Sequence, residues 1–319
     1  MSQRIVVLAL ITGFLRAQSA LIGPVEGFVF DPPTRTIRAV NGVLGSATLG
    51  RALSRDLDFA SIAPHASFGI GFRRGECLLI SGLDSGQPTA AAISACPSLP
   101  EGVAWSGDGS AAALYSRTGN WIQSLTGLPF APAAGAPVSL SPLGGALAAV
   151  AAAKSHLAFG MDSGSVYWMI PGQSFVPLAS QVQARALVFS DDESALYVLD
   201  ASNRCVVEID LATSASRIYA VDMLQDPIAL QPVGGAPHSL YVLGRADRLL
   251  VTLDGPSHQV TASVALNFEP AGFERLGKGS AVLKPRARSR DPLWAVTTTP
   301  LLSVYFIPAA TSSGEEGRR

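Results

Sequence analysis

The sequence is poor in cysteine, histidine and charged residues. Its 319 residues include only 3 Cys and 4 His, and Asp, Glu, Lys and Arg together make up 15% of the chain. With so few cysteine and histidine ligands, a centre that binds several metal ions is not expected. The chain is 48% hydrophobic, and its low content of charged residues excludes both an intrinsically disordered protein and a helical bundle with highly charged surfaces. The formal net charge of -1 removes the electrostatic case for nucleic-acid binding, which needs a basic surface.

Long apolar runs are also missing, except near the start. Gly, Pro or charge interrupts every other apolar stretch before it reaches the ~20 residues that span a bilayer, so we expect no membrane-spanning segment. Residues 1–19 instead have the form of a signal peptide: Arg4 gives a positive n-region, residues 5–15 are apolar, and residues 17–19 fit an A-x-A-like cleavage site. A first buried strand is the alternative. We expect an exported protein, either periplasmic or extracellular.

Export bears on the three thiols, because disulfides persist outside the cytosol. Cys77 and Cys96 lie 19 positions apart, and Cys205 is left over. A Cys77–Cys96 disulfide would close a loop of roughly 20 residues and stabilise the fold by ~3 kcal/mol if unstrained. Three buried, reduced thiols are the alternative. Without a C-x-x-C pair or a His near any Cys, no zinc site is expected.

Turn residues and an internal repeat dominate the rest of the chain. It holds 31 Gly and 22 Pro, and few windows show the 3.6-residue apolar period of a helix. A bulky residue marks the equivalent place in successive units at intervals of 43, 45, 39, 41 and 43 residues. These positions are Ile62, Trp105, Val150, Phe189, Leu230 and Phe273. Four short strands in about 42 residues, separated by turns, form one blade of a β-propeller.

A second pattern concerns hairpins that we expect at the outside of blades. Three alternating strands end in Asp, and Ser or Thr follows three residues later, where an Asx-type turn would form. They are residues 28–31 with Thr34, residues 207–210 with Thr213, and residues 251–254 with Ser257.

Two units carry a resemblance to a known family. Residues 103–125 (VAWSGDGSAAALYSRTGNWIQSL) and 187–213 (LVFSDDESALYVLDASNRCVVEIDLAT) resemble the YVTN-type, WD40-like repeats of secreted bacterial propellers. The S-P-D-G turn of that family appears here as residues 106–109 and 190–193, while the Gly-His and Trp-Asp signatures of true WD40 blades are absent. The resemblance extends loosely from Gly27 to Pro308 and implies an all-β propeller of four-stranded antiparallel blades.

The number of blades follows from length. About 300 mature residues at about 42 per blade give roughly seven, and we favour seven blades over six. The hairpin at residues 27–40 has no inner strands before it, so we expect C-terminal strands near 293–297 and 303–307 to join it and close the ring. The domains are then a signal peptide at residues 1–19, one propeller at 20–310 and a flexible polar tail at 311–319.

The sequence assigns no catalytic residue, metal ligand or cofactor. There is no G-x-S-x-G nucleophile elbow, and the acidic run 191–193 lacks the spacing of a calcium loop and is interpreted as a solvated turn. The alternating cations Lys284, Arg286, Arg288 and Arg290 are interpreted as an exposed loop. No pair of the four histidines has ligand spacing; they are His65, His156, His238 and His258.

These observations favour a binding or scaffold protein, monomeric, with a ligand site at the central channel or the loops of its top face. The sequence assigns no binding residues, and the partner we expect is a protein or a glycan. The alternative is a hydrolase- or lactonase-like propeller enzyme that uses channel carboxylates and a metal. One fold hosts many functions, so only the geometry of a site separates the two.

Overall fold

The computed structural model describes residues 24–308, apart from residues 65–66, 98, 237, 278–279, 286–292 and 299–300. The signal peptide expected at residues 1–19 and the tail expected at 311–319 lie outside the described residues, as do His65 and the three arginines of the 284–290 alternation.

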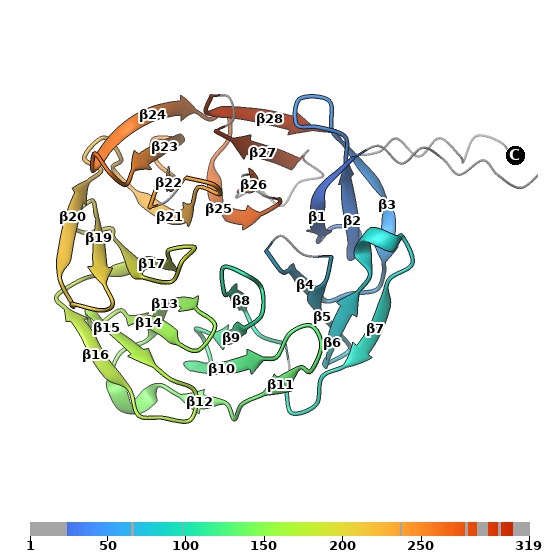
Figure 1. Ribbon diagram of the computed structural model, residues 1–319, viewed down its shortest axis with the longest axis horizontal. Coiled ribbons are helices and arrows are strands. Elements are labelled where there is room, and N and C mark those ends of the chain that lie inside the picture. The colour runs from blue at the N-terminus through green and yellow to red at the C-terminus, as the bar shows by residue number, and fades with distance from the viewer. Residues whose placement is uncertain are drawn as a thin grey trace, which may run out of the picture.

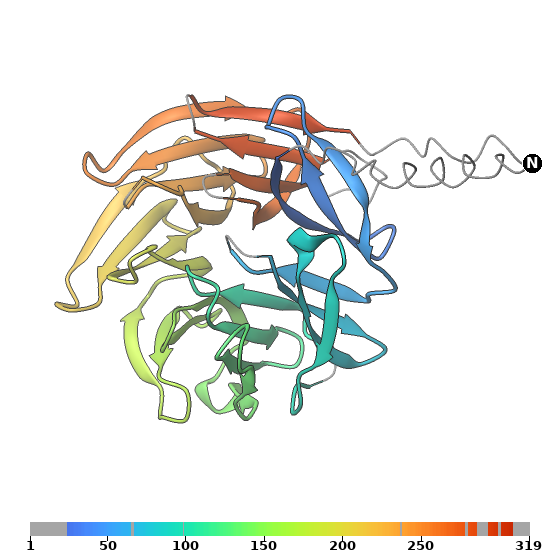
Figure 2. The same cartoon turned by 45° about the vertical axis from the view of Figure 1, so that its right-hand side comes forward.

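Seven antiparallel sheets stand around a central axis, which makes the fold a seven-bladed β-propeller (Figures 1 and 2). We number the sheets as blades 1–7 along the chain. Within the described residues the only helical elements are two 3₁₀ turns, η1 (Leu83–Ser85) and η2 (Ser141–Leu143). The all-β class and the count of seven blades are therefore confirmed.

The strands of each blade follow one another in sequence from the centre of the ring outward. Blade 1 contains β1 (Val25–Asp31), β2 (Thr36–Asn41) and β3 (Thr48–Ser54). Blade 2 contains β4 (Phe59–Ile62), β5 (Gly69–Arg73), β6 (Glu76–Ser81) and β7 (Thr89–Ala92). Blade 3 contains β8 (Gly102–Trp105), β9 (Ala112–Ser116) and β10 (Trp121–Thr126), with β11 (Ala133–Ala134) and β12 (Val138–Ser139) both paired to β10. Blade 4 contains β13 (Leu147–Ala152), β14 (Leu157–Met161), β15 (Ser165–Met169) and β16 (Val176–Ser180). Blade 5 contains β17 (Ala184–Phe189), β18 (Ala195–Asp200), β19 (Cys205–Asp210) and β20 (Ser216–Ala220). Blade 6 contains β21 (Pro227–Pro232), β22 (Leu240–Gly244), β23 (Leu249–Asp254) and β24 (Gln259–Ala265). Blade 7 contains β25 (Pro270–Arg275), β26 (Ser280–Pro285), β27 (Leu293–Thr297) and β28 (Ser303–Ile307).

The six repeat positions all lie on innermost strands. Ile62, Trp105, Val150, Phe189, Leu230 and Phe273 fall on β4, β8, β13, β17, β21 and β25. The Ala-rich run in β13 is a strand despite its helix-forming composition, because the sheets on either side leave only an extended segment room to pair.

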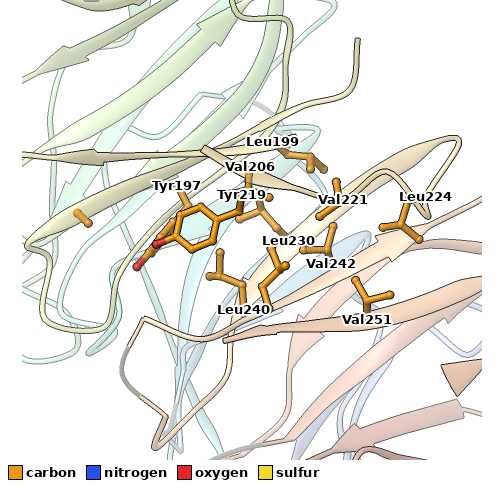
Figure 3. Packing of buried hydrophobic residues seen from close by; sticks show 12 residues of the cluster. Tyr197, Leu199, Val206, Tyr219, Val221, Leu224, Leu230, Leu240, Val242 and Val251 are labelled. Carbon is orange, nitrogen blue, oxygen red and sulfur yellow. The ribbon is translucent and has the colours of Figure 1, made fainter. Parts of the chain in front are cut away.

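The repeat is visible in the sequence because strands at different depths of a blade are buried to different degrees. Every residue of the second strands β18 and β22 is buried, so these strands are almost continuously apolar. The outermost strand β24 alternates between exposed and half-buried residues because one of its faces meets solvent. Side chains of blades 5 and 6 fill the space between the two sheets, including Tyr197, Leu199, Val206, Leu240 and Val242 (Figure 3).

The predicted Asp turns form as expected. The hydroxyl of Thr213 donates to Asp210 Oδ1 at 2.8 Å, and that of Ser257 donates to Asp254 Oδ2 at 2.6 Å. Both turns join the two outer strands of their blades. Thr34 and Asp31 make the same contact at 2.5 Å, but there the prediction of an outer hairpin is wrong. β1 packs against β4, the innermost strand of blade 2, so the first hairpin begins at the centre of the ring.

The expected closure of the ring is also wrong. β27 and β28 lie at the predicted residues, yet they pair with β26 and with each other and so complete blade 7. Blade 1 has three strands in the described part of the chain. The reason is local: β26 offers a free edge a few residues before β27, so pairing there closes a much shorter loop than pairing with β1 would.

Side-chain packing joins blades 1 and 7 in place of a shared sheet. Val29, Val40 and Leu49 of blade 1 are buried against Leu276 and Ile307 of blade 7. Polar contacts reinforce this junction, because the Ser280 hydroxyl donates to Glu26 Oε1 at 2.9 Å and the Leu49 amide donates to the Pro308 carbonyl at 3.3 Å.

Candidate functional site: the arginine mouth of the channel

The central channel is a cavity of about 490 Å³, and more of its exposed lining is polar than apolar. Each of blades 2–7 contributes from its innermost strand, with Ser61, Val103, Ala149, Leu187, Leu230 and Phe273. Leu187 and Leu230 are nevertheless buried in the packed interfaces between blades, so the channel itself presents a largely polar surface.

Loops cross the channel at the end where the innermost strands finish. Gly107, in the turn after β8, lies against the turn after β17, where a Cβ on Gly107 would stand 3.4 Å from the Asp191 carbonyl oxygen. Arg275, at the end of β25, donates to Asp191 Oδ1 at 2.8 Å. The acidic run 191–193 is thus more than a solvated turn, because it ties together blades 3, 5 and 7 across this end.

The opposite end opens into a second cavity of about 570 Å³. Two repeated positions build its wall. One is the second residue of the innermost strand, which gives Ala148, Arg185, Ile228 and Ala271. The other is the residue directly after the second strand, which gives Arg117, Asp162, Ala201 and Arg245. Three arginines thus line the cavity at this end, and we call Arg117, Arg185 and Arg245 the arginine mouth.

The three arginines differ in their partners. Arg245 pairs with Asp226 Oδ2 at 2.7 Å. Arg117 donates from Nε to the Ala148 carbonyl at 3.0 Å and lies over the Tyr115 ring. Arg185 is exposed and has no hydrogen bond or ion pair with any described residue. It is therefore free to bind an anionic group from outside.

Nearby carboxylates are already engaged in turns. Glu101 accepts from the Thr118 amide at 2.8 Å and from the Ser116 hydroxyl at 2.9 Å. The bonds from Thr118 are the main reason why the pKa of Glu101 falls to about 2. Asp162 accepts from the Ala146 amide at 2.8 Å. Both carboxylates thus serve local structure.

The residues singled out in the sequence are scattered. His156 stacks on Trp168, with ring centroids 4.8 Å apart, and Lys284 pairs with Glu274 at 2.8 Å. His258 lies against Tyr219, and His238 lines a separate pocket described below. Across the part of the chain that the structure describes, no three His, Cys, Asp or Glu side chains gather to hold a metal ion. In that same part, no helix has the length and apolar character needed to cross a bilayer.

Cys77 and Cys96 lie close together, as the disulfide hypothesis requires. Both are free thiols in this structure. They belong to one apolar cluster between blades 2 and 3 and interact directly, while Cys205 lies in blade 5. The hydrogen bond with Cys96 and burial both raise the pKa of the Cys77 thiol far above its usual range. The bond itself stays a prediction.

Solved structures resemble this fold, whereas no family model and no curated protein matches the sequence. Hsv2 from Kluyveromyces lactis superposes with a TM-score of 0.59 at 7% identity, over 89% of this chain and 98% of that chain. Virginiamycin B lyase from Staphylococcus aureus gives 0.55 at 12% identity, over 83% and 92%. AztD from Citrobacter koseri gives 0.52 at 9% identity, over 86% and 93%. At such identities the likeness shows the fold alone.

Proposed function

We propose that the protein is a binding propeller that takes a ligand or partner through an anionic group at the arginine mouth. The exposed and unpaired guanidinium of Arg185 is the observation that carries this proposal. Arginine pairs with carboxylate and phosphate groups through two parallel hydrogen bonds, which gives both affinity and orientation.

The size and lining of the cavity favour a ligand with two parts. About 570 Å³ at the mouth lies within the usual range of small-molecule pockets. Beside the arginines, the same cavity has apolar lining from Ala148, Ile228 and Ala271. The ligand that fits best has a carboxylate or phosphate at one end and an apolar body at the other. An acidic side chain of a partner protein or glycan would use the same arginines.

Replacement of Arg185 tests the proposal. We expect hexanoate or hexyl phosphate to bind the wild-type protein in calorimetry, and Arg185→Ala to weaken binding roughly 10- to 100-fold, as for the loss of a hydrogen bond to a charged group. Arg217→Ala, on the exposed outer strand of the same blade, is the matched control and should bind normally. Hexanol should bind far more weakly than hexanoate. Equal binding of hexanoate by Arg185→Ala and wild type, or the absence of any anion binding, contradicts the proposal.

We also propose that the protein is exported. The form of residues 1–19 supports this, with Arg4 before the apolar run and small residues after it. Expression of the full chain in a bacterial host, followed by N-terminal sequencing of the periplasmic protein, should give a mature N-terminus near Ala20. An intact Met1 on periplasmic material would contradict the prediction.

A further inference from the structure

A buried polar cluster lies between blades 5 and 6, at the opposite end of the inner strands from the arginine mouth. Glu208 is only 8% exposed, and the Tyr219 hydroxyl donates to its Oε2. His238 Nδ1 lies 2.8 Å from the Tyr197 hydroxyl and 3.8 Å from Glu208 Oε1. Tyr197 and Tyr219 lie side by side in the packed interface of the two blades (Figure 3). Burial, reinforced by Glu208, raises the pKa of both tyrosines, so both keep their protons.

Tyr197 and His238 of this cluster line a cavity of about 300 Å³, which we call the blade 5–6 pocket. The other walls include Asp192 in the turn after β17 and the apolar residues Pro232, Ala236 and Leu240. Glu208 Oε1 and the Tyr197 hydroxyl both lie against His238 Nδ1. The other charged groups that line the pocket are the carboxylates of Asp191 and Asp192.

The turn that carries Asp192 has an equivalent in blade 3, the turn that carries Asp108. Asp108 Oδ1 accepts from the hydroxyls of Ser106 and Ser110 at 2.9 and 2.8 Å. Asp192 Oδ1 accepts from Ser190 and Ser194 in the same way, at 2.6 and 2.8 Å. The two turns match in backbone conformation as well, since Gly109 and Glu193 at their fourth positions both have positive φ, 75° and 58°.

The two turns differ in the second carboxylate oxygen. Asp108 Oδ2 lies 3.3 Å from the ammonium group of Lys154, which comes from the turn between the first two strands of the next blade. In blade 5 the corresponding turn of the next blade carries His238. Asp192 is exposed, and its Oδ2 has no hydrogen bond or ion pair among the described residues, although, besides the bond from Ser190, a longer-range coulombic interaction with His238 lowers its pKa. The pocket lies where Lys154 lies in the equivalent interface. Asp191, the other acid of the wall, is already paired with Arg275.

We propose that the blade 5–6 pocket binds the primary ammonium group of a small amine, which takes at Asp192 the place that Lys154 takes at Asp108. Asp192 supplies the counter-charge, as Asp108 does for Lys154. The bond from Ser190 is the main reason why the pKa of Asp192 falls to about 2, so its carboxylate is charged at any physiological pH. The apolar walls receive the hydrocarbon part of the ligand.

Benzylamine is the probe, with benzyl alcohol and benzoate as neutral and anionic controls of similar size. We expect calorimetry to show binding of benzylamine alone, and Asp192→Asn to weaken it at least tenfold. Asp108→Asn removes the same charge from the equivalent turn, so it controls for loss of turn stability and should bind benzylamine normally. His238→Lys should place an ammonium group at Asp192 from within the chain, which blocks benzylamine while the fold stays intact.

Several results would overturn the proposal. They are equal binding of benzylamine and benzyl alcohol, unchanged affinity in Asp192→Asn, equal losses in Asp192→Asn and Asp108→Asn, and no binding of benzylamine at millimolar concentration. Arg185→Ala should keep full amine binding, so a failure at this pocket is distinguishable from a failure at the arginine mouth.

Discussion

Gly27→Ala is expected to lower the free energy of unfolding by roughly 3 kcal/mol, the upper end of the usual cost of overpacking. Gly27 lies on β1, where blade 1 meets blade 7. A Cβ added there would stand 2.0 Å from the Leu276 carbonyl oxygen and 2.7 Å from its carbon, so backbone atoms must move apart. Because no strand pairing within the described residues joins the two blades, this movement loosens the packed junction that closes the ring.

Gly272→Ala is the matched control for this substitution. Gly272 lies on β25, an innermost strand like β1, and a Cβ there would meet no atom within 4 Å. Its change in stability should stay within about 0.5 kcal/mol, as is usual for substitutions that break no contact. Urea unfolding followed by tryptophan fluorescence compares the two variants. If Gly27→Ala and Gly272→Ala unfold alike, the first and last blades do not depend on this close contact.

The parts of the fold that the sequence predicts are those that depend on local pattern. Trp105 and Phe189 mark innermost strands because each blade must place a bulky side chain at the same depth of the ring. Ring closure is different, because it depends on which free edge β27 and β28 reach first. That is a competition between long-range pairings, and the composition of residues 293–307 is equally suited to either partner.

The arginine mouth was not predicted from the sequence, because it too depends on contacts between distant segments. Arg117, Arg185 and Arg245 are 68 and 60 residues apart in sequence, and only the closed ring brings them to one rim. A signal was nevertheless present, since Arg117 and Arg245 both directly follow the second strand of a blade. The blade 5–6 pocket had a similar signal in the two matching S-x-D turns. What distinguishes the two turns is the residue that the next blade places beside them, Lys154 in one case and His238 in the other. That residue can be identified only once the arrangement of neighbouring blades is known.

Oxidation of Cys77 and Cys96 to a disulfide is expected to raise the free energy of unfolding by about 3 kcal/mol, the value for a loop of this length. The two thiols already interact. β7 runs antiparallel to β6, and the Ile93 amide directly after it extends the pairing by donating to the Cys77 carbonyl at 2.8 Å, which brings the following segment with Cys96 close to Cys77. A bond between them would therefore restrict the unfolded chain with little change in the folded one.

The loop that the bond would close lies within blade 2 and the segment leading to blade 3, so the gain should not depend on the rest of the ring. Unfolding with and without dithiothreitol measures it, and a non-reducing peptide map should join Cys77 to Cys96. Cys96→Ser should remove the dependence on reductant, whereas Cys205→Ser, in blade 5, should retain it. Free thiols at both positions after exposure to an oxidising glutathione buffer would contradict the disulfide. They would leave the pair as two apolar side chains in the core between blades 2 and 3.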